Sequence, residues 1–286
     1  MSKDLVIGII GGTGLTRMDN LAVTEELTVS TPFGPPSDAI LKAKIWGREV
    51  FFLPRHGRGH RIPPHRINYR ANVFALKSLG VEIILSVSAV GSMRESIVPG
   101  QLVFPDQFLD RTKQRPGTFF DEGLVAHVPF ADPLCPHLRA KLTKAAERLS
   151  IPHHTGGTYV CIEGPQFSTR AESLFYRSLG VEVIGMTNAT EARLAREAEC
   201  CYATIALATD YDCWHTSEAS VSVEAVMRLF AENVEKAKSI ISEVVKDLGP
   251  YDCPCRSALA NTITTERDAI DPEVARRLAP LVGKYL

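Results

Sequence analysis

Helix-like segments alternate with apolar, strand-like runs along most of this chain, and this order limits the folds that it can adopt. The segment from Ile67 to Leu79 has helical character, ends at Gly80 and is followed by an apolar run from Val81 to Val87. The same order recurs further along, with helices expected over 171–179 and 191–197 and strands over 181–186 and 201–209. Such alternation favours an α/β fold, with a largely parallel sheet and helices on its faces.

Two further strand signals lie in the first quarter of the chain. The β-branched run from Val6 to Ile10 ends at a glycine pair and predicts a buried strand followed by a tight turn. The runs from Ile40 to Trp46 and from Glu49 to Leu53 are separated by Gly47-Arg48, which predicts a hairpin.

The clearest helix follows Ser222, where apolar residues recur at helical spacing as far as Leu248. Gly249-Pro250 gives this helix a natural stop, and Asp271-Pro272 resembles the N-cap and first position of a short terminal helix. We therefore divide the chain into a domain over 1–249 and a C-terminal tail over 250–286.

Composition excludes several classes of function. Lys and Arg number 32 against 33 Asp and Glu, so the net charge of -1 gives no reason to expect binding to nucleic acid or anionic lipid. The N-terminal apolar run is interrupted by glycines and lacks a cleavage site, and no apolar stretch is long enough to cross a bilayer. We expect a cytoplasmic protein.

The seven cysteines have no spacing typical of a zinc site, and the chain has no C-x-x-C motif. We expect mainly buried, reduced thiols, no metal and no cofactor. Cys253-Pro254-Cys255 is the exception, because a C-x-C segment in a tail can form a small strained disulfide.

Two segments carry groups suited to an anion. The glycines from Gly8 to Gly14 lack the spacing of a dinucleotide site, but their amides and the Thr13 hydroxyl can hold an anion. Arg55 and His56 follow an apolar strand in a glycine-rich loop, and an arginine fork matches phosphate oxygens. Alone, the first segment is compatible with an ordinary turn and the second with a solvated basic loop.

Small or polar residues also end several other expected strands. Ser88 and Ala89 lie at one strand end, Met186 and Thr187 at another, and Asp210 and Asp212 at a third. In open α/β sheets, ligands bind outside the carboxyl ends of the strands. The paired acids are suited to general acid catalysis, although exposed loop acids are common. Phe167 can stack on a planar base, although on pattern alone a core aromatic fits it better.

Six motifs occur in order and at fitting intervals: Gly11-Gly12-Thr13-Gly14, Arg55-His56-Gly57, Asn68-Tyr69-Arg70-Ala71-Asn72, Glu163-Gly164-Pro165, Met186-Thr187 and Thr209-Asp210-Tyr211-Asp212. In these motifs the chain closely resembles the methylthioadenosine phosphorylases of the trimeric purine nucleoside phosphorylase family, from about Ile7 to Leu248. The resemblance implies the single-domain nucleoside phosphorylase fold, with a mixed central β-sheet flanked by helices on both faces.

The resemblance also assigns the site. It implies that phosphate, a co-substrate, is held by Thr13, Arg55, His56, Ser88, Ala89 and Thr187. It places Met186 against the ribose, Phe167, Ser168, Asp210 and Asp212 around the base, and Val223 and Val226 in an apolar methylthio pocket. His127 would reach this pocket from a neighbouring subunit, which implies a homotrimer or a dimer of trimers.

The implied reaction is reversible phosphorolysis of 5'-methylthioadenosine to adenine and 5-methylthioribose 1-phosphate, a salvage step. Asp210 would protonate N7, because a protonated Asp can donate to N7 and accept from the 6-amino group of adenine. Family members that act on 6-oxopurines generally carry Asn at this position. The resemblance further implies that Cys135 pairs with Cys201 and that Cys253 pairs with Cys255.

The chain departs from the family motifs at Gln166, where Arg is usual, and at Gly185, where Asn is common. These departures bear on fine substrate preference and not on phosphorolysis itself. Three alternatives stay open: a 6-oxopurine nucleoside or methylthioinosine phosphorylase, a hydrolytic nucleosidase, and a non-catalytic purine-binding protein.

Overall fold

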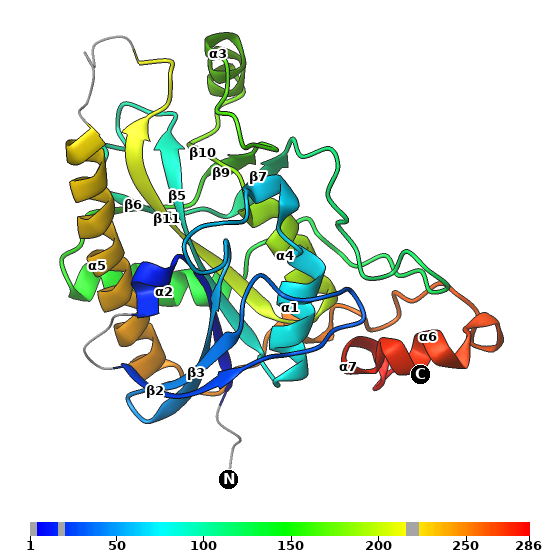
Figure 1. Ribbon diagram of the computed structural model, residues 1–286. Coiled ribbons are helices and arrows are strands. Elements are labelled where there is room, and N and C mark those ends of the chain that lie inside the picture. The colour runs from blue at the N-terminus through cyan, green and yellow to red at the C-terminus, as the bar shows by residue number, and fades with distance from the viewer. Residues whose placement is uncertain (1–4, 17–20, 216–222) are drawn as a thin grey trace.

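The computed structural model describes residues 5–16, 21–215 and 223–286, without the side chains of Thr13, Thr16 and residues 223–227. One mixed sheet forms its centre (Figure 1). The strands are β1 (Ile7–Gly11), β2 (Leu21–Leu27), β3 (Ile40–Ile45), β4 (Arg48–Pro54), β5 (Ile83–Ser92), β6 (Leu102–Phe104), β7 (Gln107–Asp110), β8 (His153–Thr155), β9 (Thr158–Cys161), β10 (Val183–Gly185) and β11 (Cys201–Tyr211). The helices are α1 (Tyr69–Ser78), α2 (Pro136–Arg148), α3 (Arg170–Ser178), α4 (Asn188–Glu197), α5 (Val223–Asp247), α6 (Pro272–Arg277) and α7 (Ala279–Val282).

The sheet has a parallel centre and antiparallel additions. Its main path runs β2-β3-β4-β1-β5-β10-β9-β7, and β11 pairs with β5 and β6 beside this path. Strands β4, β1, β5 and β11 are mutually parallel where they pair, whereas β2, β3 and the short β10 join their neighbours β3, β4 and β5 in antiparallel fashion. The expected mixed sheet is therefore confirmed, and the alternation of helix and strand correctly located its parallel part.

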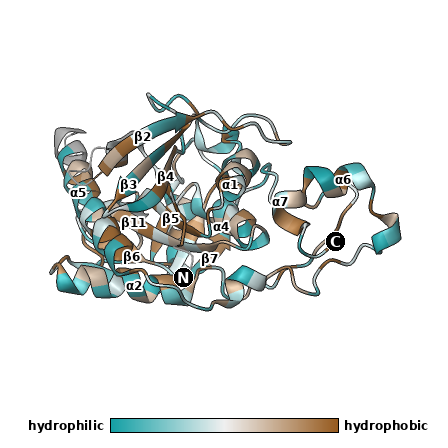
Figure 2. Cartoon of the chain, turned by 90° about the horizontal axis from the view of Figure 1, so that it is seen from below, coloured by the Kyte–Doolittle hydropathy of each residue, from teal (hydrophilic) through white to brown (hydrophobic). Residues whose placement is uncertain are grey.

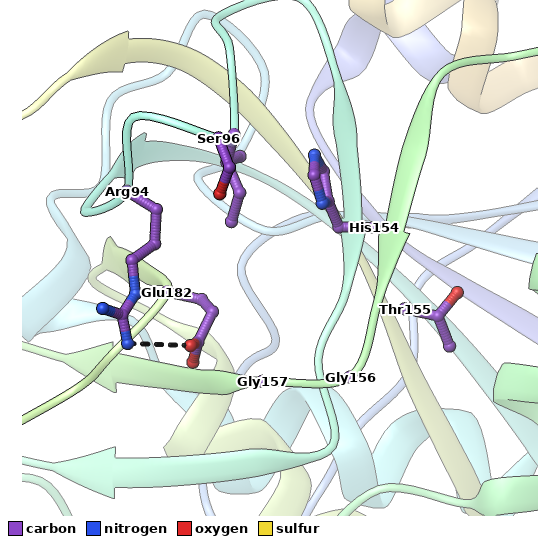
Figure 3. Close-up of a pocket in the computed structure, with 8 residues that line it drawn as sticks. Arg94, Ser96, His154, Thr155, Gly156, Gly157 and Glu182 are labelled. Carbon is purple, nitrogen blue, oxygen red and sulfur yellow. Dashed lines mark hydrogen bonds and ion pairs between the residues drawn. The ribbon is translucent and has the colours of Figure 1, made fainter.

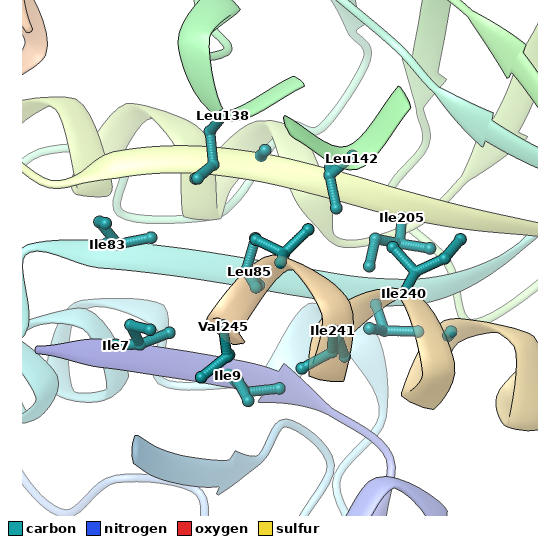
Figure 4. Close-up of a cluster of buried hydrophobic side chains, with 14 of the residues drawn as sticks. Ile7, Ile9, Ile83, Leu85, Leu138, Leu142, Ile205, Ile240, Ile241 and Val245 are labelled. Atoms are coloured by element: carbon teal, nitrogen blue, oxygen red, sulfur yellow. The ribbon is translucent and has the colours of Figure 1, made fainter. Parts of the chain in front are cut away.

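Helices cover both faces of the sheet (Figures 1 and 2). On one face α2 and α5 pack against the apolar side chains of β1, β5 and β11, as Figure 4 shows for Leu138 and Ile241 among others. On the other face α1 and α4 contribute to a second buried cluster, which includes Phe74, Leu194 and residues of α7. The carboxyl-terminal parts of β1, β4, β5 and β11 carry the candidate site.

The predicted hairpin is present, with its turn one residue earlier than expected. Strand β3 ends at Ile45, and the two linking residues, Trp46 and Gly47, have φ angles of 51° and 78°. Positive φ at both positions is the mark of a type I′ turn, whose twist matches that of antiparallel strands. Arg48 therefore belongs to β4 and not to the turn.

The C-terminal residues fold back onto the rest of the chain. Cys253 and Cys255 join the buried cluster under α2 and α5, and α7 packs against α1. Asp271 caps α6 as predicted, because its carboxylate accepts a hydrogen bond of 2.7 Å from the amide of Glu273. The division near residue 249 stays a prediction. No helix in the described ranges combines the length and hydropathy needed to cross a membrane.

Candidate active site

The pairing of β1, β4 and β5 brings together the two segments that were expected to bind an anion. Parallel pairing sets β1 between β4 and β5, and the Arg55 amide donates to the Gly11 carbonyl at 2.9 Å. The glycine turn after β1 and the Arg55-His56 loop after β4 are therefore neighbours. The Thr13 backbone lies in this turn, but its side chain is outside the described part of the chain.

Arg55 is buried, and its guanidinium donates hydrogen bonds to three residues. Its Nε and Nη2 groups donate to the two carboxylate oxygens of Glu191, and Nη1 donates to the Val87 carbonyl at 2.8 Å. The Ser86 hydroxyl accepts from Nη2 at 2.6 Å. This network fixes a cation directly behind the strand ends, with its charge balanced by one carboxylate.

Asn188, the first residue of α4, joins the two expected phosphate-binding strands. Its Oδ1 accepts from the hydroxyls of Ser88 at 2.8 Å and Thr187 at 3.1 Å, and its Nδ2 donates to Ser86, Tyr202 and Thr204. Ser88 and Thr187 are thereby brought together, and Ala89 is exposed beside them on β5. The N-terminus of α4 adds a favourable field for an anion.

His56 is a neutral ring in this arrangement. Its Nδ1 faces the Ile62 carbonyl at 2.8 Å, and its ring stacks on His60 with centroids 4.2 Å apart. Burial, reinforced by the charge of Arg55, lowers the pKa of His56 to about 4. With Nδ1–H donating to the carbonyl, Nε2 is left as the atom available to a ligand.

A bulge in β11 sets the position of Asp210. The register between β11 and β5 shifts between Ala208 and Asp210, so that Asp210 pairs with Gly91. A bulge redirects a side chain relative to its strand. The Thr209 hydroxyl donates to the Asp210 carboxylate at 2.7 Å. A Cβ at Gly91 would lie 3.1 Å from the other carboxylate oxygen, so glycine leaves room for the acid.

The residues expected around the base are partly brought together. The Ser168 hydroxyl donates to the Asp212 carboxylate at 2.9 Å, and Asp212 is only 9% exposed. Phe167, in contrast, is 83% exposed and is therefore not a core aromatic of this chain. It lies just before α3, which projects from the top of the molecule (Figure 1).

Met186 is held in place by Arg115, which the sequence did not single out, and by the Glu163-Gly164-Pro165 motif. Its carbonyl accepts from Arg115 at 2.6 Å, and Arg115 also binds the Glu163 carboxylate at 2.8 Å. Gly164 has a φ of 67°, and a Cβ there would lie 2.6 Å from the Met186 sulfur. The Glu-Gly-Pro motif therefore positions the methionine expected to face the ribose. Arg115 gave no sequence signal, because it lies in a loop without a recognisable pattern.

Glu191 and Asn188 were also missed as contributors to the site. Both are buried on α4, and the expected helix began only at Glu191. The sequence did offer one signal for Glu191, an acid on the buried side of a short amphipathic helix. A buried acid needs a cationic partner, so this position predicts a buried ion pair.

Three other expected residues are not part of the cluster at the strand ends: His127 lies apart from it, and the side chains of Val223 and Val226 are not described. His127 is exposed, and its amide pairs with the Thr262 carbonyl of the tail at 2.9 Å. The side chains of Val223 and Val226 are outside the described part of α5. Their assignments stay predictions.

The expected disulfides are not formed, because all seven cysteines are free thiols. The members of both expected pairs nevertheless converge on a single buried cluster made of Cys135, Cys201, Cys253 and Cys255. This cluster lies at the opposite end of β11 from Asp210.

A cavity of about 410 Å³ opens elsewhere, between residues 94–97 and 154–157 (Figure 3). Arg94 and Glu182 form an ion pair of 3.1 Å along its wall. The cavity contains none of the expected site residues, so the candidate site is the cluster at the strand ends.

Comparisons with known proteins identify the family of the chain. Residues 6–246 match the model of the phosphorylase superfamily. The chain is 55% identical to an S-methyl-5'-thioadenosine phosphorylase of Geobacter sulfurreducens, over 98% of this chain and 99% of the relative, and 53% identical to one of Hyperthermus butylicus, over 90% and 95%. The crystal structure of a methylthioadenosine phosphorylase from an antarctic soil metagenomic library aligns with a TM-score of 0.93 and 46% identity, covering 98% of this chain and 99% of that one. The chain therefore belongs to the phosphorylase superfamily, and within it to the family of the S-methyl-5'-thioadenosine phosphorylases.

Proposed function

We propose that this enzyme catalyses the reversible phosphorolysis of 5'-methylthioadenosine to adenine and 5-methylthioribose 1-phosphate. One relationship carries the proposal: Ser88, on the phosphate side, and Gly91, opposite the acid Asp210, lie three residues apart on β5. At a rise of about 3.3 Å per residue they are about 10 Å apart, which leaves space for a ribose between an anion and a purine. The names of the relatives give the same substrate.

In the forward reaction the glycosidic bond breaks ahead of attack, and its electron pair passes to the purine. Asp210 in its protonated form gives its proton to N7, and the Thr209 hydroxyl, at 2.7 Å, stabilises the carboxylate that remains. A phosphate oxygen then forms the new bond to C1′. Ser88 and Thr187, beside the N-terminus of α4, are suited to hold that phosphate, with the buried Arg55–Glu191 pair behind them. The Nε2 atom of neutral His56 can accept a hydrogen bond from a protonated phosphate oxygen.

Adenine is the proposed base. Protonated Asp210 can donate to N7 and accept from the 6-amino group, and Asp212, held by Ser168, offers a second acceptor at the same edge. For the 5′ end we propose a pocket that includes Val223 and Val226, because a dry apolar wall favours a methylthio group over a hydroxyl by roughly 1–3 kcal/mol.

We also propose a homo-oligomer, either a trimer or a dimer of trimers, in which His127 completes the site of a neighbouring subunit. The exposure of His127 and of Phe167 supports this assembly, since both would gain partners across a subunit boundary. The proposed location is the cytoplasm. The proposed domain covers 1–249, with 250–286 as its tail.

Product analysis with methylthioadenosine, in the presence and absence of phosphate, tests the function. We expect adenine and a sugar phosphate only when phosphate is present. Free methylthioribose without phosphate would indicate a hydrolytic nucleosidase, and binding without turnover would indicate a purine-binding protein. Parallel assays with methylthioinosine and inosine separate the 6-oxopurine alternative.

A further inference from the structure

Four cysteine sulfurs meet in the core at a place remote from the candidate active site. The Sγ atoms of Cys135, Cys201, Cys253 and Cys255 all lie within 4.8 Å of one another. Each residue is at most 5% exposed, and the sulfurs of Cys135 and Cys253 are 3.6 Å apart. We propose that this cluster is a structural zinc site, with the four thiolates as its only ligands.

The separation of the sulfurs fits tetrahedral zinc. With zinc–sulfur bonds of about 2.3 Å, the edge of a tetrathiolate tetrahedron is about 3.8 Å. The sulfurs of Cys135 and Cys253, 3.6 Å apart, match this edge. No two of the four sulfurs are more than 4.8 Å apart, so metal binding would require them to move by only about 1 Å. A disulfide needs sulfurs about 2.0 Å apart, so the cluster is closer to a metal site than to a pair of bonds.

Three separate parts of the chain hold these ligands in place. Cys135 precedes α2 and its amide donates to the Tyr202 carbonyl at 2.9 Å, while the amide of Cys201 donates to the Glu82 carbonyl at 2.9 Å. Cys253 and Cys255 flank Pro254 at the start of a 3-10 turn. Backbone contacts therefore place the sulfurs together before any metal binds.

The surroundings of the cluster offset part of the negative charge that it would carry with zinc bound. Binding converts four thiols and one Zn²⁺ into a tetrathiolate complex with two negative charges and releases four protons. Cys135 lies at the N-terminus of the 13-residue helix α2, where the helix dipole favours negative charge.

Tyr251 places a buried donor beside the cluster. Its hydroxyl is buried and makes no hydrogen bond within the described chain, although it faces Cys201. The ring is stacked on His137, with centroids 3.8 Å apart. A phenol in this place is suited to donate a hydrogen bond to a metal-bound sulfur, which is a common support for metal ligands.

The site would be closed, since all four positions are protein ligands, and closed zinc sites are structural. Two ligands come from the helix-and-sheet domain and two from the tail. Zinc would therefore fasten the C-terminal tail to the start of β11 and to the start of α2.

Metal analysis of protein purified under reducing conditions tests the proposal. We expect roughly one zinc per chain in the wild type and less than about a tenth of this in Cys255→Ser. The control is Cys200→Ser, because Cys200 is equally buried but its sulfur contacts the Val81 carbonyl and not the cluster. Metal-free protein, a mass lower by four hydrogens that reveals two disulfides, or iron in place of zinc would each overturn the proposal.

A second measurement on the wild type avoids reliance on variants that fail to fold. After removal of metal by a chelator, Co²⁺ titration should give thiolate-to-metal charge transfer and the strong visible bands of a tetrahedral ion. The weak spectrum of hydrated Co²⁺ throughout the titration would contradict a tetrathiolate site.

Discussion

Glu191 holds Arg55 through two hydrogen bonds in the interior of the protein. The carboxylate accepts from both Nε and Nη2, and the two residues are 1% and 2% exposed. The Tyr202 hydroxyl donates to the same carboxylate at 2.9 Å. Because the remaining donors bind Ser86 and Val87, the guanidinium has one orientation behind the strand ends.

Replacing Glu191 by Gln should destabilise the protein by about 3 kcal/mol, since it leaves a buried cation without its counter-charge. Urea unfolding at constant pH gives the change in the free energy of unfolding. The control is Glu273→Gln, which removes an exposed pair with Arg276 and should cost less than about 1 kcal/mol. Equal effects of the two substitutions would mean that burial of the Arg55 pair is unimportant.

Replacing Asp210 by Asn should lower kcat for methylthioadenosine by about 10²–10⁴-fold, because an amide cannot transfer a proton to N7. Steady-state kinetics at saturating phosphate measure the loss, and an unchanged Tm shows that folding is intact. A nucleoside already methylated at N7 needs no such proton, so its phosphorolysis should fall far less. A uniform loss with both substrates would assign Asp210 to binding.

Much of the fold and the general place of the site could be predicted from local patterns. Apolar runs located strands β1, β5 and β11, although β5 continues to Ser92, beyond its expected end at Val87, and β11 continues to Tyr211. The structure brings Ser168 to Asp212 and Ser88 to Thr187, while the binding roles that the resemblance implies for them stay predictions.

What the sequence did not reveal depends on contacts between distant segments. Glu191 lies 136 residues from Arg55, and Arg115 lies 71 residues from Met186. The cysteine cluster is a similar case, because its members come from three segments and neither Cys135 nor Cys201 belongs to a zinc-type motif. Local spacing indicates whether a residue lies on the buried or the exposed face of its helix or strand, but not which distant residue it contacts.

Gly185 should tolerate no side chain, although Asn is common at this position in the family. A Cβ there would lie 1.9 Å from the hydroxyl oxygen and 2.6 Å from the Cζ atom of Tyr159, which is fully buried. We expect Gly185→Ala to cost about 3 kcal/mol through overpacking. Denaturant unfolding checks this value.

A double-mutant cycle separates this clash from a backbone effect. In a Tyr159→Leu background, Gly185→Ala should cost much less, because the ring is gone. Tyr159→Phe is the matched control, since it removes the hydroxyl but leaves the ring carbon in place, so much of the penalty should persist. The same penalty in all three backgrounds would exclude Tyr159 as the cause.

Glu197 is a buried carboxyl whose ionisation is unfavourable. It is 6% exposed, and burial raises its pKa to about 7, despite hydrogen bonds of 2.7 Å each from the Thr118 hydroxyl and the Phe119 amide. The negative charge of Asp121 raises this pKa further.

The elevated pKa makes the stability of the enzyme fall as pH rises. Below the ordinary value of 4.5 the carboxyl is protonated in both the folded and unfolded states, and the stabilisation is fully present; it is lost as pH rises through about 7. The loss is up to about 3 kcal/mol.

Glu197→Gln mimics the protonated acid, because its amide can accept from Phe119 and donate to Thr118. We therefore expect the variant to match the wild type near pH 4.5 and to be more stable above pH 7 in thermal unfolding at a series of pH values. Parallel curves for the two proteins across this range would contradict the assignment, since the difference between them isolates Glu197 from every other titrating group.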